Sequence, residues 1–292
     1  MGALDGRVAV ITGAGNGIGR EHALLFAREG ASVVVNDLGD SGYGEGRDTG
    51  PAEQVAAEIR ALGGKAIANT DSVADFNAMK NLVDQAVSEF GRLDVVVNNA
   101  GILRDGFLAS MAEDQFDVVI AVHLKGHFNL MRHAAAYWKA EAKAGRGVAG
   151  AIVNTASASG TLVPNAGQFN YGAAKAGIAW MTRVAAEELG QFGVRANAIA
   201  PVARTRLTEA TPGLGAMMIA ARDAGGFDGF SPANIAPLVA YLSTEKCPHT
   251  GHVFTVSGGS IEQLQSWTAA KEHTSDGEWT IDNVAAELDG WA

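Results

Sequence analysis

The sequence has little of several features that would point to a particular cellular setting. Cys247 is the only cysteine among 292 residues, so an internal disulfide is impossible and a reducing compartment fits best. The 22 Lys and Arg against 32 Asp and Glu give a net charge of −10, which argues against nucleic acid as the main partner. No apolar run reaches the roughly 18–20 residues of a membrane helix, and no signal-peptide pattern opens the chain. We therefore expect a cytoplasmic protein that binds neither nucleic acid nor membrane.

Glycine, in contrast, is abundant at 37 residues, which suggests many tight turns or close backbone approaches to a ligand. Apolar runs alternate with helical patterns such as those at 18–29, 51–63 and 77–91. This alternation predicts an α/β fold of Rossmann type, a doubly wound parallel sheet with helices on both faces, in one domain over residues 1–265. The expected strands lie at 7–12, 32–37, 65–71, 93–101, 150–157, 194–201 and 252–259.

Two segments do not fit the alternation. Residues 38–50 are a Gly-rich acidic loop after the second expected strand. Residues 266–292 form a C-terminal extension that carries Trp267, Trp279 and Trp291. Because a disordered tail is normally poor in aromatic residues, we expect this extension to pack on its own body or on a second subunit.

The stretch "TGAGNGIG" at 12–19 joins the first expected strand to the first expected helix. Glycines in such a loop let the backbone approach a pyrophosphate, whose charge then lies at a helix N-terminus. A plain tight turn is the alternative, but the strand–loop–helix setting favours a dinucleotide. The candidate cofactor residues here are Gly13, Asn16, Gly17, Ile18 and Gly19.

Asp37 follows the second expected strand, about 20 residues past this loop. A carboxylate there can accept hydrogen bonds from both adenosine ribose hydroxyls and would repel a 2′-phosphate. The sequence therefore favours NAD over NADP, although a solvated Asp at a strand end remains the alternative.

Tyr171 and Lys175 in "YGAAK" are spaced by four residues and share one face of a helix. A neighbouring ammonium favours the phenolate, so we expect Lys175 to lower the pKa of Tyr171 and make it a usable proton acceptor. By itself, such a pair is more often an ordinary surface pair.

Together these motifs resemble the short-chain dehydrogenase/reductase family. The resemblance runs from the glycine loop through "NNAG" (98–101) and "YGAAK" to "VSGG", and so covers nearly the whole chain. The stretches "DVVVNNAGILRD", "VHLKGHF" and "GQFNYGAAK" resemble more narrowly the (3R)-hydroxyacyl-CoA dehydrogenase domains of the peroxisomal multifunctional enzyme type 2 kind and their free-standing bacterial relatives.

The resemblance implies roles for individual positions. Tyr171 and Lys175 match the catalytic pair, with Lys175 also holding the nicotinamide ribose. Ser157, 14 positions before Tyr171, matches the catalytic serine, and Ser159 is its competitor. The remaining positions match residues that contact the adenosine half of the cofactor: Asp71, Ser72, Asn98, Ala100 and Gly101.

Two departures from the family pattern concern the site. His123 stands where many members have an asparagine that holds a proton-relay water; it can relay a proton or only bond to backbone at a helix bend. After the sixth expected strand, "PVART" replaces the usual Pro-Gly, which leaves Pro201 and Thr205 as candidate contacts of the nicotinamide amide. Residues 204–231 are expected to cover an apolar substrate, and Arg204, Arg206 and Arg222 are candidates for CoA phosphates.

The expected activity is NAD-dependent oxidation of a secondary alcohol, foremost a (3R)-3-hydroxyacyl-CoA of fatty-acid or sterol side-chain β-oxidation. A hydroxysteroid dehydrogenase or a 3-oxoacyl reductase of the same fold is the alternative, and a non-catalytic NAD-binding regulator is a more distant one. No metal site is expected. The family resemblance implies a homodimer or homotetramer.

Overall fold

The computed structural model describes residues 2–39, 42, 45–46, 48–209, 214–223 and 225–291. Parts of two predicted segments, residues 40–41, 43–44 and 47 of the Gly-rich loop and residues 210–213 and 224 of the expected lid, lie outside the described residues, as does residue 292 of the extension. The strands are β1 (Val8–Thr12), β2 (Ser32–Asn36), β3 (Lys65–Asn69), β4 (Val95–Asn98), β5 (Gly150–Thr155), β6 (Val194–Pro201), β7 (Val253–Ser257) and β8 (Ser260–Leu264).

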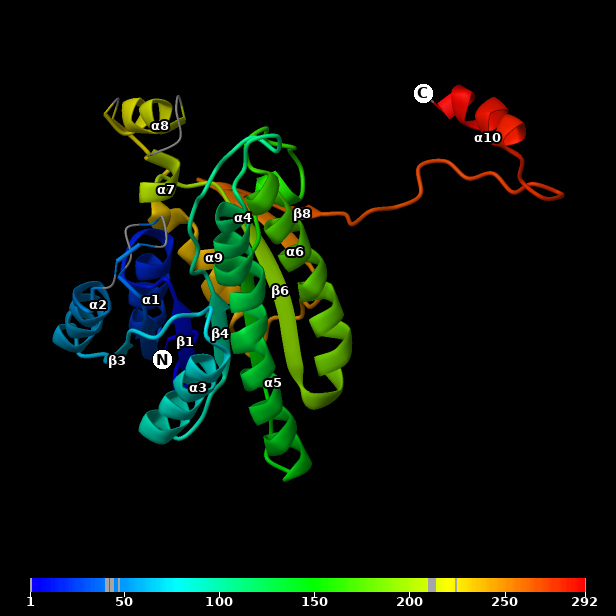
Figure 1. The fold of residues 1–292 in the computed structure, drawn as a ribbon. Helices are drawn as coiled ribbons and strands as arrows, with labels where there is room; N and C mark the ends of the chain where they lie inside the picture. The colour runs from blue at the N-terminus through cyan, green and yellow to red at the C-terminus, as the bar shows by residue number, and fades with distance from the viewer. Residues whose placement is uncertain are drawn as a thin grey trace.

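One sheet contains these strands in the order β3-β2-β1-β4-β5-β6-β7-β8 (Figure 1). All neighbours are parallel except β7 and β8, which pair antiparallel at the edge of the sheet. The predicted doubly wound parallel sheet is confirmed. Strand β8 was not expected, because "SIEQL" lacks the continuous apolar run of a buried strand and its side chains are largely exposed.

Helices cover both faces of the sheet. Alternate strand residues point to opposite faces, so Ala9 and Ile11 pack on one layer while Val8 and Val10 pack on the other. Helices α1, α2 and α9 supply the first layer, and α3, α5 and α6 supply the second. Their bounds are α1 (Gly17–Arg28), α2 (Gly50–Ala61), α9 (Ala236–Leu242), α3 (Phe76–Phe90), α5 (Gly126–Lys143) and α6 (Phe169–Leu189).

Local signals explain where the predicted helices begin and end. Pro51 lies in the first turn of α2. Asp75 caps α3 by accepting a hydrogen bond from the Ala78 N–H at 2.9 Å, and Gly91 ends the helix in the left-handed region at φ 80°. The other helices are α4 (Glu113–Ile120), which continues through a π-helical turn (Ala121–Lys125) into α5, then α7 (Arg206–Glu209), α8 (Leu214–Asp223) and α10 (Ile281–Leu288).

The C-terminal extension leaves the body as an arm that ends in α10 (Figure 1). Trp267, at the start of the arm, stacks on Trp180 of α6 with ring centroids 5.9 Å apart, yet it remains 79% exposed. Farther along, the arm bonds to itself, since Lys271 Nζ donates to the Trp291 carbonyl at 2.9 Å. Of the two expected packing modes, contact with its own body is thus seen at Trp267, and packing on a second subunit stays a prediction.

Candidate active site

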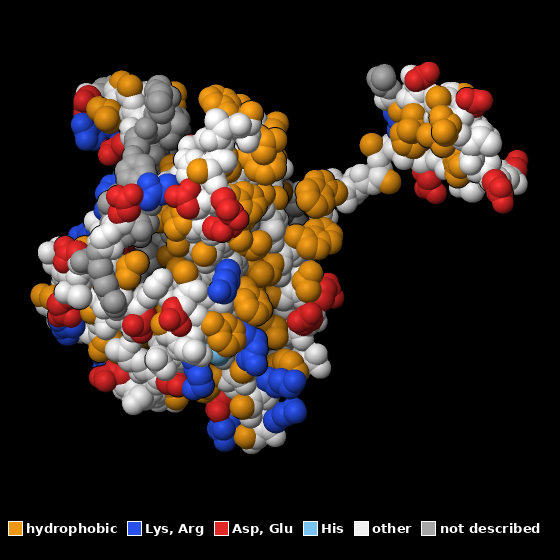
Figure 2. Space-filling model, in the orientation of Figure 1, with side chains coloured by type: hydrophobic (Ala, Val, Ile, Leu, Met, Phe, Trp, Pro, Cys, Tyr) orange, Lys and Arg blue, Asp and Glu red, His pale blue; other side chains and the backbone are white. Residues whose placement is uncertain are grey.

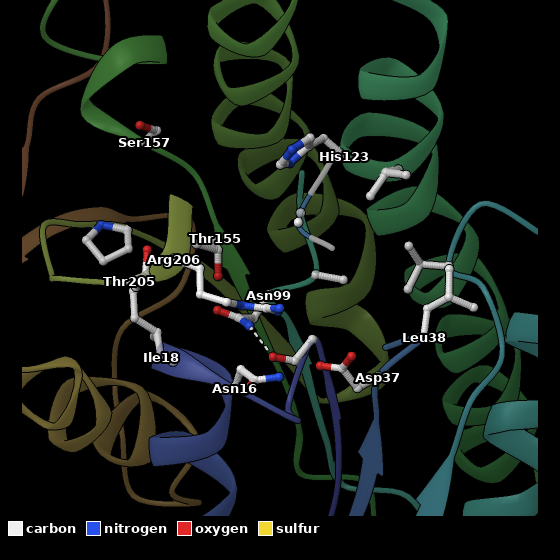
Figure 3. Close-up of a pocket in the computed structure, with 18 of the residues that line it drawn as sticks. Asn16, Ile18, Asp37, Leu38, Asn99, His123, Thr155, Ser157, Thr205 and Arg206 are labelled. Carbon is white, nitrogen blue, oxygen red and sulfur yellow. Dashed lines mark hydrogen bonds between the residues drawn. The ribbon is translucent and has the colours of Figure 1, made fainter. Parts of the chain in front are cut away.

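The sheet order reverses direction between β1 and β4, and a cavity opens at the carboxyl ends of these strands. Figure 3 shows residues from distant parts of the chain meeting there. Most of the predicted site residues line the cavity: Gly13, Asn16, Gly17, Ile18, Asp37, Asp71, Ser72, Ala100, Gly101, His123, Ser157, Tyr171, Lys175, Pro201 and Thr205. Gly19 and Asn98 are not among the lining residues.

The glycine loop is shaped for a close backbone approach. Gly13 and Gly17 have φ values of 62° and 53°, which L side chains rarely adopt. Gly19 lies behind the loop, where a Cβ would be 2.1 Å from the Gly13 carbonyl oxygen. The three glycines therefore have different tasks: two turn the backbone, and the third lets α1 pack against the loop. This geometry leaves the N-terminal turn of α1 facing the cavity, as a dinucleotide pyrophosphate requires.

Asp37 is held in place at the end of β2 by two backbone amides. The Gly15 N–H donates to its Oδ2 at 2.8 Å, and the Gly39 N–H donates to its Oδ1 at 2.8 Å. A Cβ at Gly15 would lie 2.8 Å from Oδ2, so only glycine permits this contact. The carboxylate is fixed beside the loop, where an adenosine ribose would lie.

The two asparagines of "NNAG" point in different directions. Asn98 is buried in the sheet, where its Nδ2 donates to Asn154 Oδ1 at 2.9 Å, so the structure separates it from the cavity. Asn99 lines the cavity instead, and its Nδ2 donates to the carbonyls of Thr12 and Gly13 at 3.0 and 3.1 Å. Sequence reasoning missed Asn99; the alternation of side chains at the end of a strand was the available signal.

The catalytic candidates come from β5 and α6. Lys175 is 2% exposed, and its Nζ donates to the Thr155 carbonyl at 2.5 Å while lying 5.5 Å from the centre of the Tyr171 ring. Asn170, which sequence reasoning also missed, ties the start of α6 to the Arg104 and Gln115 carbonyls, each at 2.9 Å. The structure therefore brings the expected pair together on one side of the cavity.

The electrostatics of this pair differ from the expectation. Burial raises the pKa of the Tyr171 phenol above its usual value, and the group that lowers it is the Ser157 hydroxyl, as a hydrogen-bond partner. Burial also lowers the pKa of Lys175 to about 7. The expected lowering of the Tyr171 pKa by Lys175 is therefore not seen in this pocket, where desolvation has the largest effect on that pKa and raises it.

The structure also distinguishes the two candidate serines. Ser157 lines the cavity, directly before a 3₁₀ turn (Ala158–Gly160). The Ser159 hydroxyl instead donates to Gln168 Oε1 at 2.8 Å and accepts from Asn165 Nδ2 at 2.7 Å, within a network outside the cavity lining. This geometry favours Ser157 as the hydroxyl that meets a substrate.

His123 lies in the π-helical turn and is 1% exposed. Its Nε2 is 2.8 Å from the Ile102 carbonyl and 3.1 Å from the Ile102 amide, and its ring meets Tyr171 edge-on at 5.2 Å. Burial, assisted by the charge of Lys175, lowers the pKa of His123 to about 3. The residue is thus neutral at physiological pH and bonded to backbone, which matches the simpler of its two expected roles.

Three arginines after β6 have different surroundings. Arg204 is bonded to both carboxylate oxygens of Asp228, at 3.1 and 2.6 Å, and Arg222 pairs with Asp223 at 2.8 Å. Arg206 lines the cavity, together with Thr205 and Thr208. The Thr205 N–H donates to Thr208 Oγ1 at 2.7 Å, so Thr208 positions the residue expected to contact the nicotinamide.

Comparison with known proteins shows to which family the chain belongs. Residues 7–213 match the short chain dehydrogenase family. The chain belongs to this family. It is therefore an oxidoreductase acting on a CH–OH group with a nicotinamide cofactor. The glycine loop and Asp37 fit such a cofactor, since both line the cavity and the positive φ angles of Gly13 and Gly17 bring the backbone close to it.

Individual relatives narrow the resemblance. The chain is 40% identical to the hydroxyacyl-CoA dehydrogenase ChsB1 of Mycobacterium tuberculosis, over 98% of this chain and 88% of that protein. It is 42% identical to mouse peroxisomal multifunctional enzyme type 2 over 90% of its length, but spans only 33% of that enzyme. A crystal structure of a short chain dehydrogenase from Mycobacterium avium is 46% identical, with a TM-score of 0.86, and covers 99% of this chain and 96% of that one.

Two searches of the described residues concern other kinds of site. None of the helices described is both long and apolar enough to cross a membrane. Within the same residues, no group of three or more His, Cys, Asp and Glu side chains could hold a metal ion.

Proposed function

We propose that the protein uses NAD to oxidise a (3R)-3-hydroxyacyl-CoA to the 3-oxoacyl-CoA. The observation that carries the reaction type is the meeting of Ser157, Tyr171 and buried Lys175 in the cavity that also contains the glycine loop and Asp37. The substrate class is supported by the similarity to the hydroxyacyl-CoA dehydrogenase ChsB1 and to the multifunctional enzyme.

A bound nicotinamide cofactor would supply the acceptor for the hydride that the carbinol carbon loses. Tyr171 takes the hydroxyl proton as the C=O bond forms. Ser157 hydrogen-bonds the same oxygen and the phenol, which orients both and favours the ionised phenol. Lys175, fixed by the Thr155 carbonyl, holds its amine beside the phenol ring.

A second direction of the same chemistry has a specific observation in its favour. Because burial raises the pKa of Tyr171, the phenol carries its proton at neutral pH and is suited to donate it. That state serves a 3-oxoacyl reductase, so reduction is the alternative. The two directions share every residue named above and differ in the pH at which each is fastest.

NAD is proposed over NADP because of Asp37. Its carboxylate cannot rotate away from an adenosine 2′-phosphate without losing the bonds from Gly15 and Gly39. The resulting repulsion weakens NADP relative to NAD. Replacement of Asp37 by Asn should therefore lower the ratio of kcat/KM with NAD to kcat/KM with NADP.

We further propose that the segment 204–231 covers the substrate. The ion pair between Arg204 and Asp228 links the two ends of this segment. Figure 1 shows α7 and α8 above α1. Met217 and Ile219 of α8 and Phe227 beyond it expose apolar side chains that suit an acyl or sterol chain.

A homodimer or homotetramer is proposed on the surface of α5 and α6. Figure 2 shows hydrophobic side chains gathered along these helices, and Phe128, Phe169, Trp180 and Val184 are among the exposed large apolar residues. Such a contiguous patch is typical of a protein interface. Light scattering of the purified protein tests the assembly.

The decisive experiment is a substrate screen followed by NADH absorbance. We expect turnover of (3R)-3-hydroxyacyl-CoA thioesters, including sterol side-chain thioesters, and little with the (3S) epimers or with free hydroxysteroids. Preference for a free steroid, or for NADPH and a 3-oxoacyl thioester on acyl-carrier protein, would support the alternatives instead. NADH binding without turnover of any alcohol or ketone would indicate a regulator.

A further inference from the structure

The cavity contains few positive charges for a site that must hold a dinucleotide in a protein of net charge −10. Two acids, Asp37 and Asp71, line it. Among the lining residues that the structure describes, the Lys and Arg side chains are Lys175 and Arg206. Lys175 is buried at the catalytic end and bonded to Thr155. Arg206 is therefore the other lining cation among the described residues.

Arg206 follows a residue that touches the glycine loop. It is the first residue of α7, and the Thr205 methyl just before it lies 3.5 Å from the position that a Cβ would have at Gly17. Gly17 is the first residue of α1. The start of α7 thus lies beside the start of α1 at the cavity, and Figure 3 shows the Arg206 side chain directed into the cavity, toward Asn99 and Asn16.

The base of this segment is fixed independently of any ligand. The Arg204 N–H donates to the Phe230 carbonyl at 2.7 Å, and its guanidinium is bonded to both oxygens of Asp228. Thr208 accepts the Thr205 N–H and donates to the Ala203 carbonyl at 2.9 Å. Arg206 therefore extends from an anchored turn, which limits the positions that its guanidinium can reach.

We propose that Arg206 binds the pyrophosphate of the dinucleotide cofactor together with the start of α1. The N–H groups at the start of α1 hold some of the phosphate oxygens, and the guanidinium, whose planar donors suit phosphate oxygens, holds others. The bound cofactor then links α7 to the glycine loop. This replaces the expected contact of Arg206 with CoA phosphates, and it rests on dinucleotide binding within the proposed function, independently of the alcohol.

The test is cofactor binding without substrate. Titration calorimetry should show that Arg206→Gln weakens NADH binding about tenfold, the loss typical of one charge-assisted pair at a partly exposed site. ADP-ribose, which carries the pyrophosphate, should weaken by a similar factor, whereas adenosine should bind as it does to the wild type. Added salt should weaken NADH binding to the wild type more steeply than to the variant.

Arg222→Gln is the matched control, because Arg222 is exposed on neighbouring α8, pairs with Asp223 and does not line the cavity. It should bind NADH like the wild type, and thermal melting without ligand should show that both variants fold. Arg206→Lys should recover part of the lost affinity.

Three results would overturn the proposal: unchanged NADH affinity in Arg206→Gln, an equal loss for adenosine, or weakened CoA binding with unchanged NADH binding. If the wild type binds NADH but oxidises no hydroxyacyl-CoA, the proposed substrate is wrong. The NADH affinity of Arg206→Gln would still test the proposed role of Arg206.

Discussion

The two ends of the cavity are built on different physical principles. At the proposed catalytic end, burial favours the neutral form of both side chains: it raises the pKa of Tyr171 and lowers the pKa of Lys175. At the glycine-loop end, binding depends on backbone shape, with φ values near 60° at Gly13 and Gly17 and no space for a Cβ at Gly19. Loss of a hydroxyl at the first end should therefore act on turnover, and added volume in the glycine loop should act on binding.

The largest effect is expected at the catalytic end. Tyr171→Phe removes the proton acceptor and should lower kcat by about 10³-fold, within the range for general acid–base catalysis. NADH affinity, measured by calorimetry, should stay close to that of the wild type. Tyr241→Phe, at an exposed tyrosine on α9, is the control and should leave kcat unchanged. Equal losses of kcat and of NADH binding would show that the two ends are not separable.

Ser157→Ala should lower kcat about 10²-fold, because one preorganised donor to the reacting oxygen is lost. It should also move the pH profile. The Ser157 hydroxyl lowers the pKa of Tyr171, so its loss raises that pKa further, and the rise of the oxidation rate with pH should shift to higher pH. Ser159→Ala, outside the cavity lining, serves as the control. If the pH dependence of the oxidation rate does not shift, the ionisation that controls this rate belongs to a group other than Tyr171.

At the glycine-loop end, Gly19→Ala should weaken NADH binding by about tenfold or more. The new methyl would meet the Gly13 carbonyl, and relieving such overpacking typically costs about 1–3 kcal/mol, where 1.4 kcal/mol is a factor of ten in affinity. Residual turnover at saturating NAD should approach the wild-type kcat. Gly147→Ala, where a Cβ meets nothing within 4 Å, is the matched control. A loss confined to kcat would contradict the division between the ends.

The effect that is smallest at neutral pH concerns stability. His22, buried in α1 behind the glycine loop, has its pKa lowered to about 3 by desolvation. Between about pH 6.5 and pH 3, the imidazole of His22 is therefore protonated in the unfolded chain but not in the folded chain. The free energy of unfolding should fall in this window by about 1.4 kcal/mol for each pH unit that the pH is lowered. In urea unfolding measured across this pH window, His22→Leu should therefore make the free energy of unfolding depend less steeply on pH, by the contribution of one proton.

The sequence predicted most of the site because its signals are local. Glycines at the turn between a strand and a helix, an acid at the end of the next strand, and a four-residue spacing on one helix face each follow from backbone geometry alone. Contacts between distant segments were harder to foresee. Strand alternation separates Asn98 from Asn99, but the structure was needed to show which of the two faces the cavity. Arg206 could be assigned to the cavity only once the start of α7 had been placed beside Gly17.

By itself, the sequence determined the doubly wound sheet, the place of the cofactor loop and the pairing of Tyr171 with Lys175, because hydrophobic period and residue spacing act over short distances. Only the tertiary structure decided how strongly burial disfavours the charged forms of these two side chains. The raised pKa of Tyr171 and the lowered pKa of Lys175 arise from burial by segments far apart in the chain. Desolvation depends on everything packed around a group, and a linear pattern does not contain that information.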